Sequence, residues 1–423
     1  MTTNGNEPVG GTDETLSADS SGPRPDIDGS RTPSTRTLPA STTAGRSPTP
    51  STRTLPASTT SGGWDPLAAV RRPVDPPLDV LLSGTVFFDL VFTGLARMPG
   101  PGEELWSEGL GSCPGGIANL ATAAARLGLR TGLVAGFGDD AYADWMWDTL
   151  SRDEGIDLSA SRRFEHFHSA LTVSIATAGD RAMITHGHPL PEPLSAMAGR
   201  APAARAAVVD LHGETDWWAF LAARGTRIFA DIGFDETGRW DVADLAPLAH
   251  CHAFTPNAVE AMAYTRTDTA DRAVRKLADR VPLAVVTDGV QGALAIDSST
   301  GEEAFCPAVP VTALDTTGAG DVFAAAMTLG TLAEWPLVER LKFASLCSAL
   351  AVQQFGGSLA APGWGDIADW WRTVRAQADA GDLRAAYTRD QYLFLDGIVP
   401  TCTVQGKRRA QGTFALRSDA GEY

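Results

Sequence analysis

From residue 79 onward, short apolar runs of strand length alternate with longer segments of helical periodicity. Strands are predicted where an apolar run ends in a polar residue or glycine, at 79–92, 131–138, 169–177, 206–213, 227–233 and 282–289. Helices are predicted where apolar residues recur every three or four positions, at 116–128, 142–155, 215–225 and 366–380. This alternation predicts an α/β fold: a doubly wound, mostly parallel sheet flanked by helices.

Polar residues near the carboxyl ends of the predicted strands are the first candidates for a site. They are Asp231, Asn257 and Thr287. In open parallel sheets, ligands bind in the crevice beyond the carboxyl ends of the strands. The pattern therefore predicts a ligand site at that edge.

The two ends of the chain differ from its middle. Residues 1–63 are dominated by Ser, Thr, Pro and Gly, contain no aromatic residue, and carry the string PSTRTLPASTT twice, at 33–43 and 50–60. Such a segment buries too little apolar surface to offset the entropy cost of ordering. We therefore expect a disordered tail over 1–76, with order beginning near Asp79, a folded domain over 77–380, and a partly ordered extension over 381–423.

Composition excludes several classes of protein. The net charge of −17, from 34 Lys and Arg against 51 Asp and Glu, argues against a nucleic-acid-binding protein, which usually has a basic face. None of the three lysines ends a GxxxxGK[ST] run, which excludes a Walker-type phosphate loop. No apolar stretch of about 18 residues predicts a membrane span, and the polar N-terminus predicts no secretory signal. Five widely spaced cysteines predict reduced thiols in a cytoplasmic protein.

The most informative string is DTTGAGDVFAAAMTLG, residues 315–330. Gly318, Ala319 and Gly320 directly precede a strong helical pattern, so their backbone N–H groups and the helix dipole would form an anion hole. Asp321 then lies in the first turn of that helix, where a carboxylate can take a proton from an attacking hydroxyl. The alternative is an ordinary helix start, with the aspartate as its N-cap.

Four further strings accompany it. Gly115 and Gly116 precede a predicted helix that carries Asn119 in its first turn, and Asp89 closes the first predicted strand. The string TPNAVEA places Asn257 and Glu260 on one helix face, where they could equally be a solvated pair. The string VVTDGVQGA places Thr287 and Gly289 in a turn between two strands.

Together these strings resemble the ribokinase-like (PfkB) family of sugar and nucleoside kinases. GGIANLATAAARLG is similar to the first signature of that family, and DTTGAGDVFAAA is similar to the second and more specific one. The order of the motifs also matches, and the resemblance covers roughly residues 79–365.

The resemblance implies ATP-dependent phosphorylation of a hydroxyl group on a sugar or sugar-like molecule, with Mg²⁺ as the divalent ion. It implies that Asp321 is the general base and that Gly318, Ala319 and Gly320 stabilise the transferring phosphoryl group. It assigns the acceptor's hydroxyls to Asp89, Gly115, Gly116 and Asn119. It assigns the nucleotide and its Mg²⁺ to Asn257, Glu260, Thr287 and Gly289.

A monovalent cation site behind the anion hole is also implied, built largely from backbone carbonyls that suit K⁺. The matching positions are Asp315, Thr317, Ala351, Gln354, Gly356 and Ala360. The sequence departs from the family pattern at Ala360, where the family has a serine, so one ligand is in doubt. It also departs at Asp231 and Asp235, where many ribokinases have an Asn-Pro-Ala string, which points to an unusual substrate.

The family fold adds a small β-sheet lid, expected here from about 92–113 and 168–186. Many members dimerise through that lid, and the sequence leaves homodimerisation open. A nucleoside kinase is the main alternative, because Phe87, Phe88 and Phe167 could stack on a base. A catalytically silent sugar-binding regulator on the same fold is a further alternative, although the complete GAGD string argues against it. A dinucleotide-binding dehydrogenase is excluded because no GxGxxG follows the first strand.

Overall fold

The computed structural model describes residues 65–400, except 178–179, 214, 234 and 236. The main sheet has eight strands in the order β14-β13-β12-β11-β10-β9-β1-β4, and its register is parallel from β12 to β4. Its strands are β1 (Leu78–Ser83), β4 (Thr131–Val134), β9 (Ala204–Asp210), β10 (Arg227–Asp231), β11 (Ala253–Phe254), β12 (Leu283–Thr287), β13 (Ala293–Asp297) and β14 (Glu302–Cys306). The antiparallel strands β13 and β14 complete one edge. The predicted mostly parallel α/β sheet is confirmed.

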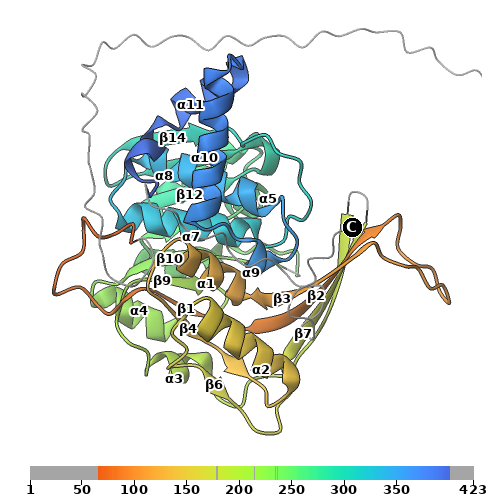
Figure 1. Ribbon diagram of the computed structural model, residues 1–423. Coiled ribbons are helices and arrows are strands. Elements are labelled where there is room, and N and C mark those ends of the chain that lie inside the picture. Colours follow the sequence, from red (N-terminus) through yellow and green to blue (C-terminus); the bar gives the residue numbers. More distant parts are fainter. Residues whose placement is uncertain (1–64, 178–179, 214, 234, 236, 401–423) are drawn as a thin grey trace, which may run out of the picture. The chain divides into compact units, whose positions relative to one another are not determined.

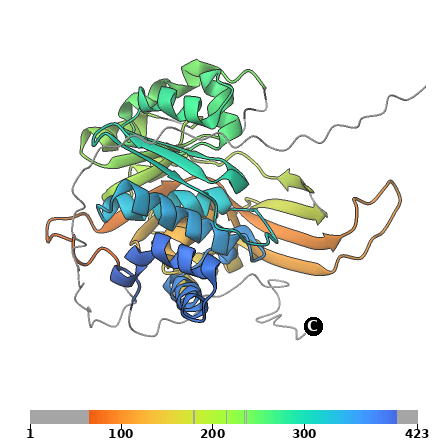
Figure 2. The ribbon, with the colours of Figure 1, turned by 90° about the horizontal axis from the view of Figure 1, so that it is seen from above.

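Helices cover both faces of this sheet, and a separate hydrophobic cluster lies under each layer (Figure 2). One layer contains α1 (Ile117–Arg126), α2 (Ala141–Asp148), α7 (Ala319–Leu332), α8 (Leu337–Ala351) and α10 (Trp364–Asp379). The other contains α3 (Leu194–Ala198), α4 (Asp216–Ala223), the 3₁₀ segment η2 (Val242–His250), α5 (Ala258–Thr265) and α6 (Ala270–Ala278). The shorter elements are η1 (Thr149–Asp153), β5 (Gly136–Phe137), β6 (Arg162–Arg163), η3 (Gly289–Gln291), α9 (Gly357–Ala360), α11 (Leu383–Gln391) and η4 (Leu393–Gly397).

A second sheet of four strands, in the order β3-β2-β7-β8, corresponds to the expected lid and extends away from the helices (Figure 1). Its strands are β2 (Val86–Leu95), β3 (Gly109–Gly116), β7 (Ala170–Thr177) and β8 (Asp180–His186). The single strand expected over 79–92 is wrong, because the chain leaves the main sheet at Ser83 and enters the lid at Val86. Asp89 therefore lies inside β2, opposite Cys113, and does not close a strand.

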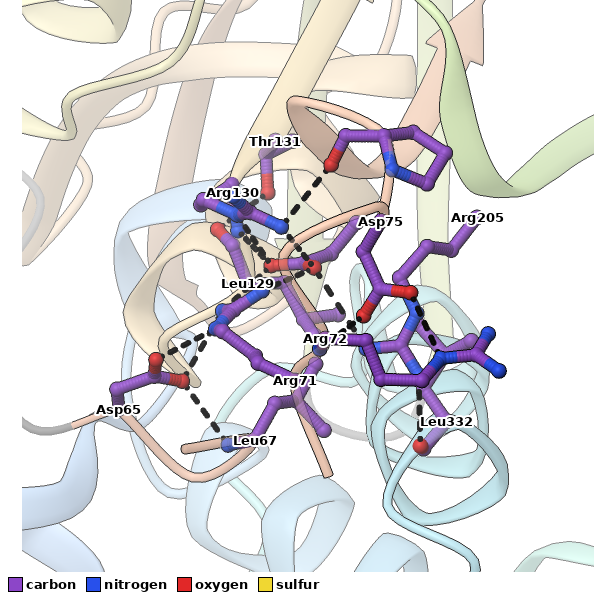
Figure 3. A network of polar contacts seen from close by, with 12 residues as sticks. Asp65, Leu67, Arg71, Arg72, Asp75, Leu129, Arg130, Thr131, Arg205 and Leu332 are labelled. Carbon is purple, nitrogen blue, oxygen red and sulfur yellow. Dashed lines mark hydrogen bonds and ion pairs between the residues drawn. The ribbon is translucent and has the colours of Figure 1, made fainter. Parts of the chain in front are cut away.

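The amino end of β1 carries a buried ion network (Figure 3). Asp79 is fully buried and accepts hydrogen bonds from Arg71 at 2.5 and 2.8 Å and from Arg130 at 2.8–3.3 Å. Arg71 also bonds Asp65, and Leu67 is fully buried, so residues 65–71 already pack on the domain. The tail before residue 65 and the chain after residue 400 lie outside the described residues.

The state of the cysteines and the presence of membrane-spanning helices can be checked in the described residues. Cys113, Cys251, Cys306 and Cys347 are all free and buried, whereas Cys402 lies outside the described chain. In the described part of the chain, no helix combines the length and apolar character that crossing a membrane requires.

Candidate active site

Helix α7 begins at the Gly318–Gly320 string with an open N-terminus. Its N-cap is Gly318, which has φ 74° and gives no side-chain cap to the first turn. A Cβ on Gly318 would also meet Gly357 Cα at 3.1 Å, so conformation and close packing both require glycine there. Gly320 borders open space, because a Cβ there would meet no atom within 4 Å. The start of α7 therefore has no side-chain cap and has open space beside Gly320, which suits the binding of an anion.

Asp321 lies in the first turn of α7 and is not its N-cap, which removes the simplest alternative for this residue. Asn119, from the first turn of α1, donates from Nδ2 to Asp321 Oδ2 at 3.2 Å. This hydrogen bond joins residues 202 positions apart in the sequence. The two helix starts that the sequence singled out therefore meet at one point.

Asn119 brings an unpaired acceptor to that point. Its Oδ1 is buried and has no hydrogen-bond partner among the described residues. A Cβ on Gly357 would collide with this side chain, so Gly357 is part of the site although the sequence did not indicate it. Leaving a buried acceptor without a donor costs about 1–3 kcal/mol, and a hydroxyl group could supply that donor.

The lid brings Asp89 to the glycines that precede α1. Strands β2 and β3 pair Asp89 with Cys113 and Phe87 with Gly115. A Cβ on Gly115 would overlap the Asp89 carboxylate, and one on Gly116, which has φ 62°, would collide with the Phe87 ring. The two glycines therefore let the carboxylate and an aromatic ring lie against the backbone at the start of the helix.

The same rung of the lid carries two hydroxyl groups that sequence reasoning missed. Thr172 on β7 pairs with Asp89, and Thr185 on β8 pairs with Thr172. The two threonine Oγ1 atoms are hydrogen-bonded at 3.1 Å. Since paired residues share a face of a sheet, this polar rung lies on the Asp89 face. The alternating pattern of 169–177 could have indicated Thr172.

Phe88 lies on the opposite face and is fully buried, with its ring 4.6 Å from Tyr142 and 5.4 Å from Trp145. It is therefore a core residue and cannot stack on a ligand. Phe87 is only partly buried and shares the face of Asp89.

A second group of predicted residues lines a cavity of about 330 Å³. Its lining includes Asn257 and Glu260 from the start of α5, and Thr287 and Gly289 from the turn after β12. Asn257 Oδ1 accepts from the Glu260 backbone N–H at 3.0 Å, and Glu260 Oε2 accepts from the Asn257 N–H at 3.0 Å. This capping box fixes the pair, in which Glu260 is buried and Asn257 is exposed, so Glu260 is not part of a solvated helix face.

Among the described residues, the carboxyl edge of the sheet concentrates acids that have no cationic partner: Glu260 is buried, and Asp231 and Asp321 are partly buried. Burial raises the pKa of Asp321 to about 6, against the opposing effect of the Asn119 hydrogen bond. Burial, and then the negative charges of Asp321 and Glu260, raises the pKa of Asp231 to about 8. Burial also raises the pKa of Glu260. Asp231, at the end of β10, is thus within electrostatic reach of both groups of site residues.

The residues matched to a monovalent cation site are also brought together. Asp315 accepts from the Gly356 N–H at 3.1 Å and from the Thr317 N–H at 2.9 Å. The Gly356 carbonyl accepts from the Ala360 N–H at 2.8 Å, and the Ala351 carbonyl accepts from the Gln354 N–H at 2.9 Å. These contacts place Thr317 and Gly356 beside the Asp315 carboxylate, just before the start of α7. In the described residues, no group of three or more His, Cys, Asp or Glu side chains could hold a metal ion.

Curated relatives are sugar kinases. Ribokinase from Schizosaccharomyces pombe is 27% identical over 311 residues, covering 67% of this chain and 95% of that protein. Fructokinase from Klebsiella pneumoniae is 29% identical over 281 residues, covering 59% of this chain and 89% of that protein.

Solved structures share the fold at lower identity. Arabidopsis thaliana ribokinase, complexed with ribose and ATP, matches with a TM-score of 0.58 and 21% identity, over 70% of this chain and 98% of that one. The Burkholderia thailandensis nucleoside kinase in complex with inosine matches with a TM-score of 0.58 and 20% identity, over the same shares. The sequence pattern of the pfkB family of carbohydrate kinases matches residues 108–363, which is more than half of the chain. This protein therefore belongs to the pfkB family of carbohydrate kinases.

Proposed function

We propose that this protein transfers the terminal phosphoryl group of ATP to a hydroxyl group of a sugar or sugar-like molecule. The observation that carries the proposal is the meeting of Asn119 and Asp321, 3.2 Å apart, beside the open start of α7. A base beside an anion hole is the arrangement that a phosphoryl transfer to a hydroxyl requires.

Asp321 acts as the general base. Its raised pKa, about 6, leaves it mostly ionised at neutral pH yet more basic than an ordinary aspartate. The acceptor's hydroxyl gives its proton to the Asp321 carboxylate while its oxygen forms a bond to the terminal phosphorus of ATP. The bond from that phosphorus to the bridging oxygen breaks, and ADP leaves.

The Gly318–Gly320 turn holds the oxygens of the phosphoryl group during transfer. Its N–H groups and the positive end of the α7 dipole stabilise charge that is greatest in the transition state. Glycine at 320 leaves the turn unobstructed, since a side chain there would occupy the open space beside the backbone.

The cavity beside α5 takes the nucleotide. Thr287 and Gly289 border the ATP, and Asn257 and Glu260 act on Mg²⁺ through water and the phosphates. The lining fits this use, because Glu260 has no cationic partner in the described residues and a divalent ion would lower the cost of its charge. When bound, Mg²⁺ neutralises the charge of the phosphates.

The acceptor lies between the lid and α1. The Asp89 carboxylate accepts hydrogen bonds from its hydroxyls, Asn119 orients the reacting one, and Gly115 and Gly116 leave room for the Asp89 carboxylate and the Phe87 ring beside the backbone. A nucleoside remains a second candidate acceptor because Phe87 presents a partly buried ring on this face. K⁺ bound near Asp315, by the Ala351 and Gly356 carbonyls, would support the geometry of the anion hole.

The experiment is a screen for ADP release from ATP across neutral sugars and nucleosides, with the Asp321→Asn variant as the matched blank. We expect release with at least one acceptor by the wild-type protein and at least about 100-fold less by the variant. Release that depends on no acceptor, or that the variant retains, would contradict the proposal. Tight sugar binding without any ADP release would identify a silent sugar-binding regulator.

A further inference from the structure

A basic groove of about 910 Å³ lies at the far end of α5 from the nucleotide cavity. Four cationic residues, Arg239, Arg266, Lys276 and Arg280, and two acidic ones, Asp241 and Asp279, contribute to its lining. The lining is therefore net positive in a chain of net charge −17. The volume is within the range of small-molecule sites, which is about 300–1,000 Å³.

Part of this positive charge serves the fold. Lys276 donates to the Thr265 carbonyl at 2.9 Å, at the end of α5. Arg266 donates to the carbonyls of Arg239 and Trp240 at 2.6 and 3.1 Å, through one of its terminal nitrogens. These contacts satisfy carbonyl groups that the fold leaves open, and they need no ligand.

The rest of the charge has no such explanation. Within the described chain, the Arg280 side chain makes no hydrogen bond or ion pair. Arg239 uses only Nε, on the Thr237 hydroxyl at 3.2 Å. A neighbouring depression differs, because its Arg272 is paired with Asp268 at 2.7 Å. The groove therefore contains guanidinium N–H groups that have no acceptor among the described residues, whereas the neighbouring Arg272 is paired with an acid.

The backbone at the groove is also strained. Arg266 has φ 52° and Trp240 has φ 50°, two of the four non-glycine residues with positive φ in the described chain. The Arg266 side chain bonds the Trp240 carbonyl, and the Trp240 N–H donates to Asp235 at 2.6 Å. Such conformations persist only where the surroundings hold them, and they gather at functional sites.

We propose that this groove binds a phosphorylated small molecule and that its occupancy alters nucleotide binding through α5. Planar guanidinium groups bind phosphate oxygens in pairs, and more than one guanidinium can share the several oxygens of a phosphate. Helix α5 has eight residues, so it is about 12 Å long. Its first residues line the nucleotide cavity, and Tyr264, Thr265 and Arg266 at its end line the groove.

A second contact links the groove to the carboxyl edge of the main sheet. Tyr264 Oη lies 3.2 Å from His212 Nε2, and His212 follows the carboxyl end of β9. A ligand that draws Arg239 and Arg266 together would therefore act on both α5 and the edge of the sheet. The coupling is reciprocal, so nucleotide binding must change the affinity of the groove by the same factor.

The test uses inorganic pyrophosphate as the probe, measured by calorimetry without divalent metal on the full chain saturated with ADP. Loss of one charge-assisted hydrogen bond weakens binding about 10-fold or more, so the double variant R239A/R280A should lose at least that much. The control variant R272A changes the neighbouring depression and should bind within about twofold of wild type, because its charge is already paired. Equal affinity in all three proteins, or an equal loss in R272A, would overturn the site.

The effect of the groove on nucleotide binding is tested separately, through the affinity for ADP in the presence of pyrophosphate. Pyrophosphate competes with ADP at the nucleotide cavity in every variant, so the competition in R239A/R280A is the baseline. Wild type should show a further change in ADP affinity of about twofold or more beyond that baseline. An identical response in wild type and R239A/R280A would overturn the coupling. Since only binding is measured, neither result depends on the identity of the kinase acceptor.

Discussion

The main sheet has an amino edge, where its parallel strands begin, and a carboxyl edge, where they end. Carboxylates at these two edges have opposite surroundings and opposite pKa shifts. At the amino edge, burial alone would raise the pKa of Asp79, but hydrogen bonds from Arg71 and Arg130 outweigh it and the pKa is lowered. At the carboxyl edge, burial raises the pKa of Asp321 to about 6, and burial together with neighbouring acids raises that of Asp231 to about 8. The difference lies in the partners. Asp79 is paired with Arg71 and Arg130 (Figure 3), whereas Asp321 and Asp231 have no cationic partner among the described residues.

This contrast separates stabilisation from function. A carboxylate that is paired and hydrogen-bonded holds the fold together, and removing one partner is costly. A carboxylate kept without a cation is unfavourable for the fold, yet it is ready to accept a proton or to meet a bound cation. Substitutions at the amino edge should therefore mainly change the free energy of unfolding, and substitutions at the carboxyl edge should mainly change turnover or substrate binding.

The largest expected effect is on turnover, from Asp321→Asn. The amide keeps the shape and the contact with Asn119 but cannot take a proton, so kcat should fall by about 10²–10⁴-fold. The melting temperature should stay the same or rise, because an unpaired buried charge is removed. Both quantities are measured on the acceptor found by the ADP-release screen. Normal turnover with a normal melting temperature would remove Asp321 from the mechanism.

Asp79→Asn should lower stability and leave turnover unchanged. It removes the buried acceptor that Arg71 and Arg130 share, but Arg71 keeps Asp65 and Arg130 is partly exposed, so the expected loss is about 1–3 kcal/mol of unfolding free energy. The kcat of the folded fraction should not change. Denaturant unfolding measures the loss, with Asp148→Asn as the control, since its exposed pair with Arg152 should contribute less than about 1 kcal/mol. Equal stability of the two variants would show that the amino-edge network does not hold the fold.

Asp89→Ala should raise KM for the acceptor about 10-fold or more, because hydroxyl groups lose a buried partner. KM for ATP should change little, since the nucleotide cavity has a separate lining. Steady-state kinetics in both substrates measures the two constants. A parallel rise in both would place Asp89 in the general support of the crevice and not at the acceptor.

The smallest effect concerns the pH dependence of stability at Asp231. Because its folded pKa is raised to about 8, its contribution to stability is fully present below the unfolded value of about 4 and is lost as pH rises through 8. Asp231→Asn removes that loss, so the variant should gain about 1 kcal/mol or more over wild type between pH 5 and pH 9. Denaturant unfolding at both pH values measures the gain, and a constant difference would show that Asp231 has an ordinary pKa when folded.

Much of the carboxyl-edge site could be predicted from the sequence, but only where the chemistry is local. The glycines before α7 and α1, and the NxxE pair at α5, lie in short strings whose backbone geometry follows from neighbouring residues. The contact of Asn119 with Gly357 could not be predicted in this way, because it joins residues far apart in the chain. The same holds for Asp79, whose partners come from before β1 and from the start of β4.

The division between β1 and β2 was also missed, for a local reason. Residues 79–92 hold two apolar runs separated only by Ser83, Gly84 and Thr85, and periodicity alone does not show that so short an interruption marks a change of sheet. The buried strand β1 and the alternating strand β2 differ only in which neighbours cover them, and this depends on the tertiary fold.

The most direct test of Asp321 as the base is the pH dependence of kcat/KM for the acceptor. Because Asp321 must be ionised to accept a proton, the rate should fall on the acid side with a pKa of about 6. The residual rate of Asp321→Asn should show no such limb over the range in which wild type does. The same limb near pH 6 in the variant would contradict the assignment of Asp321 as the general base, whereas a limb near pH 4 in wild type would contradict its raised pKa.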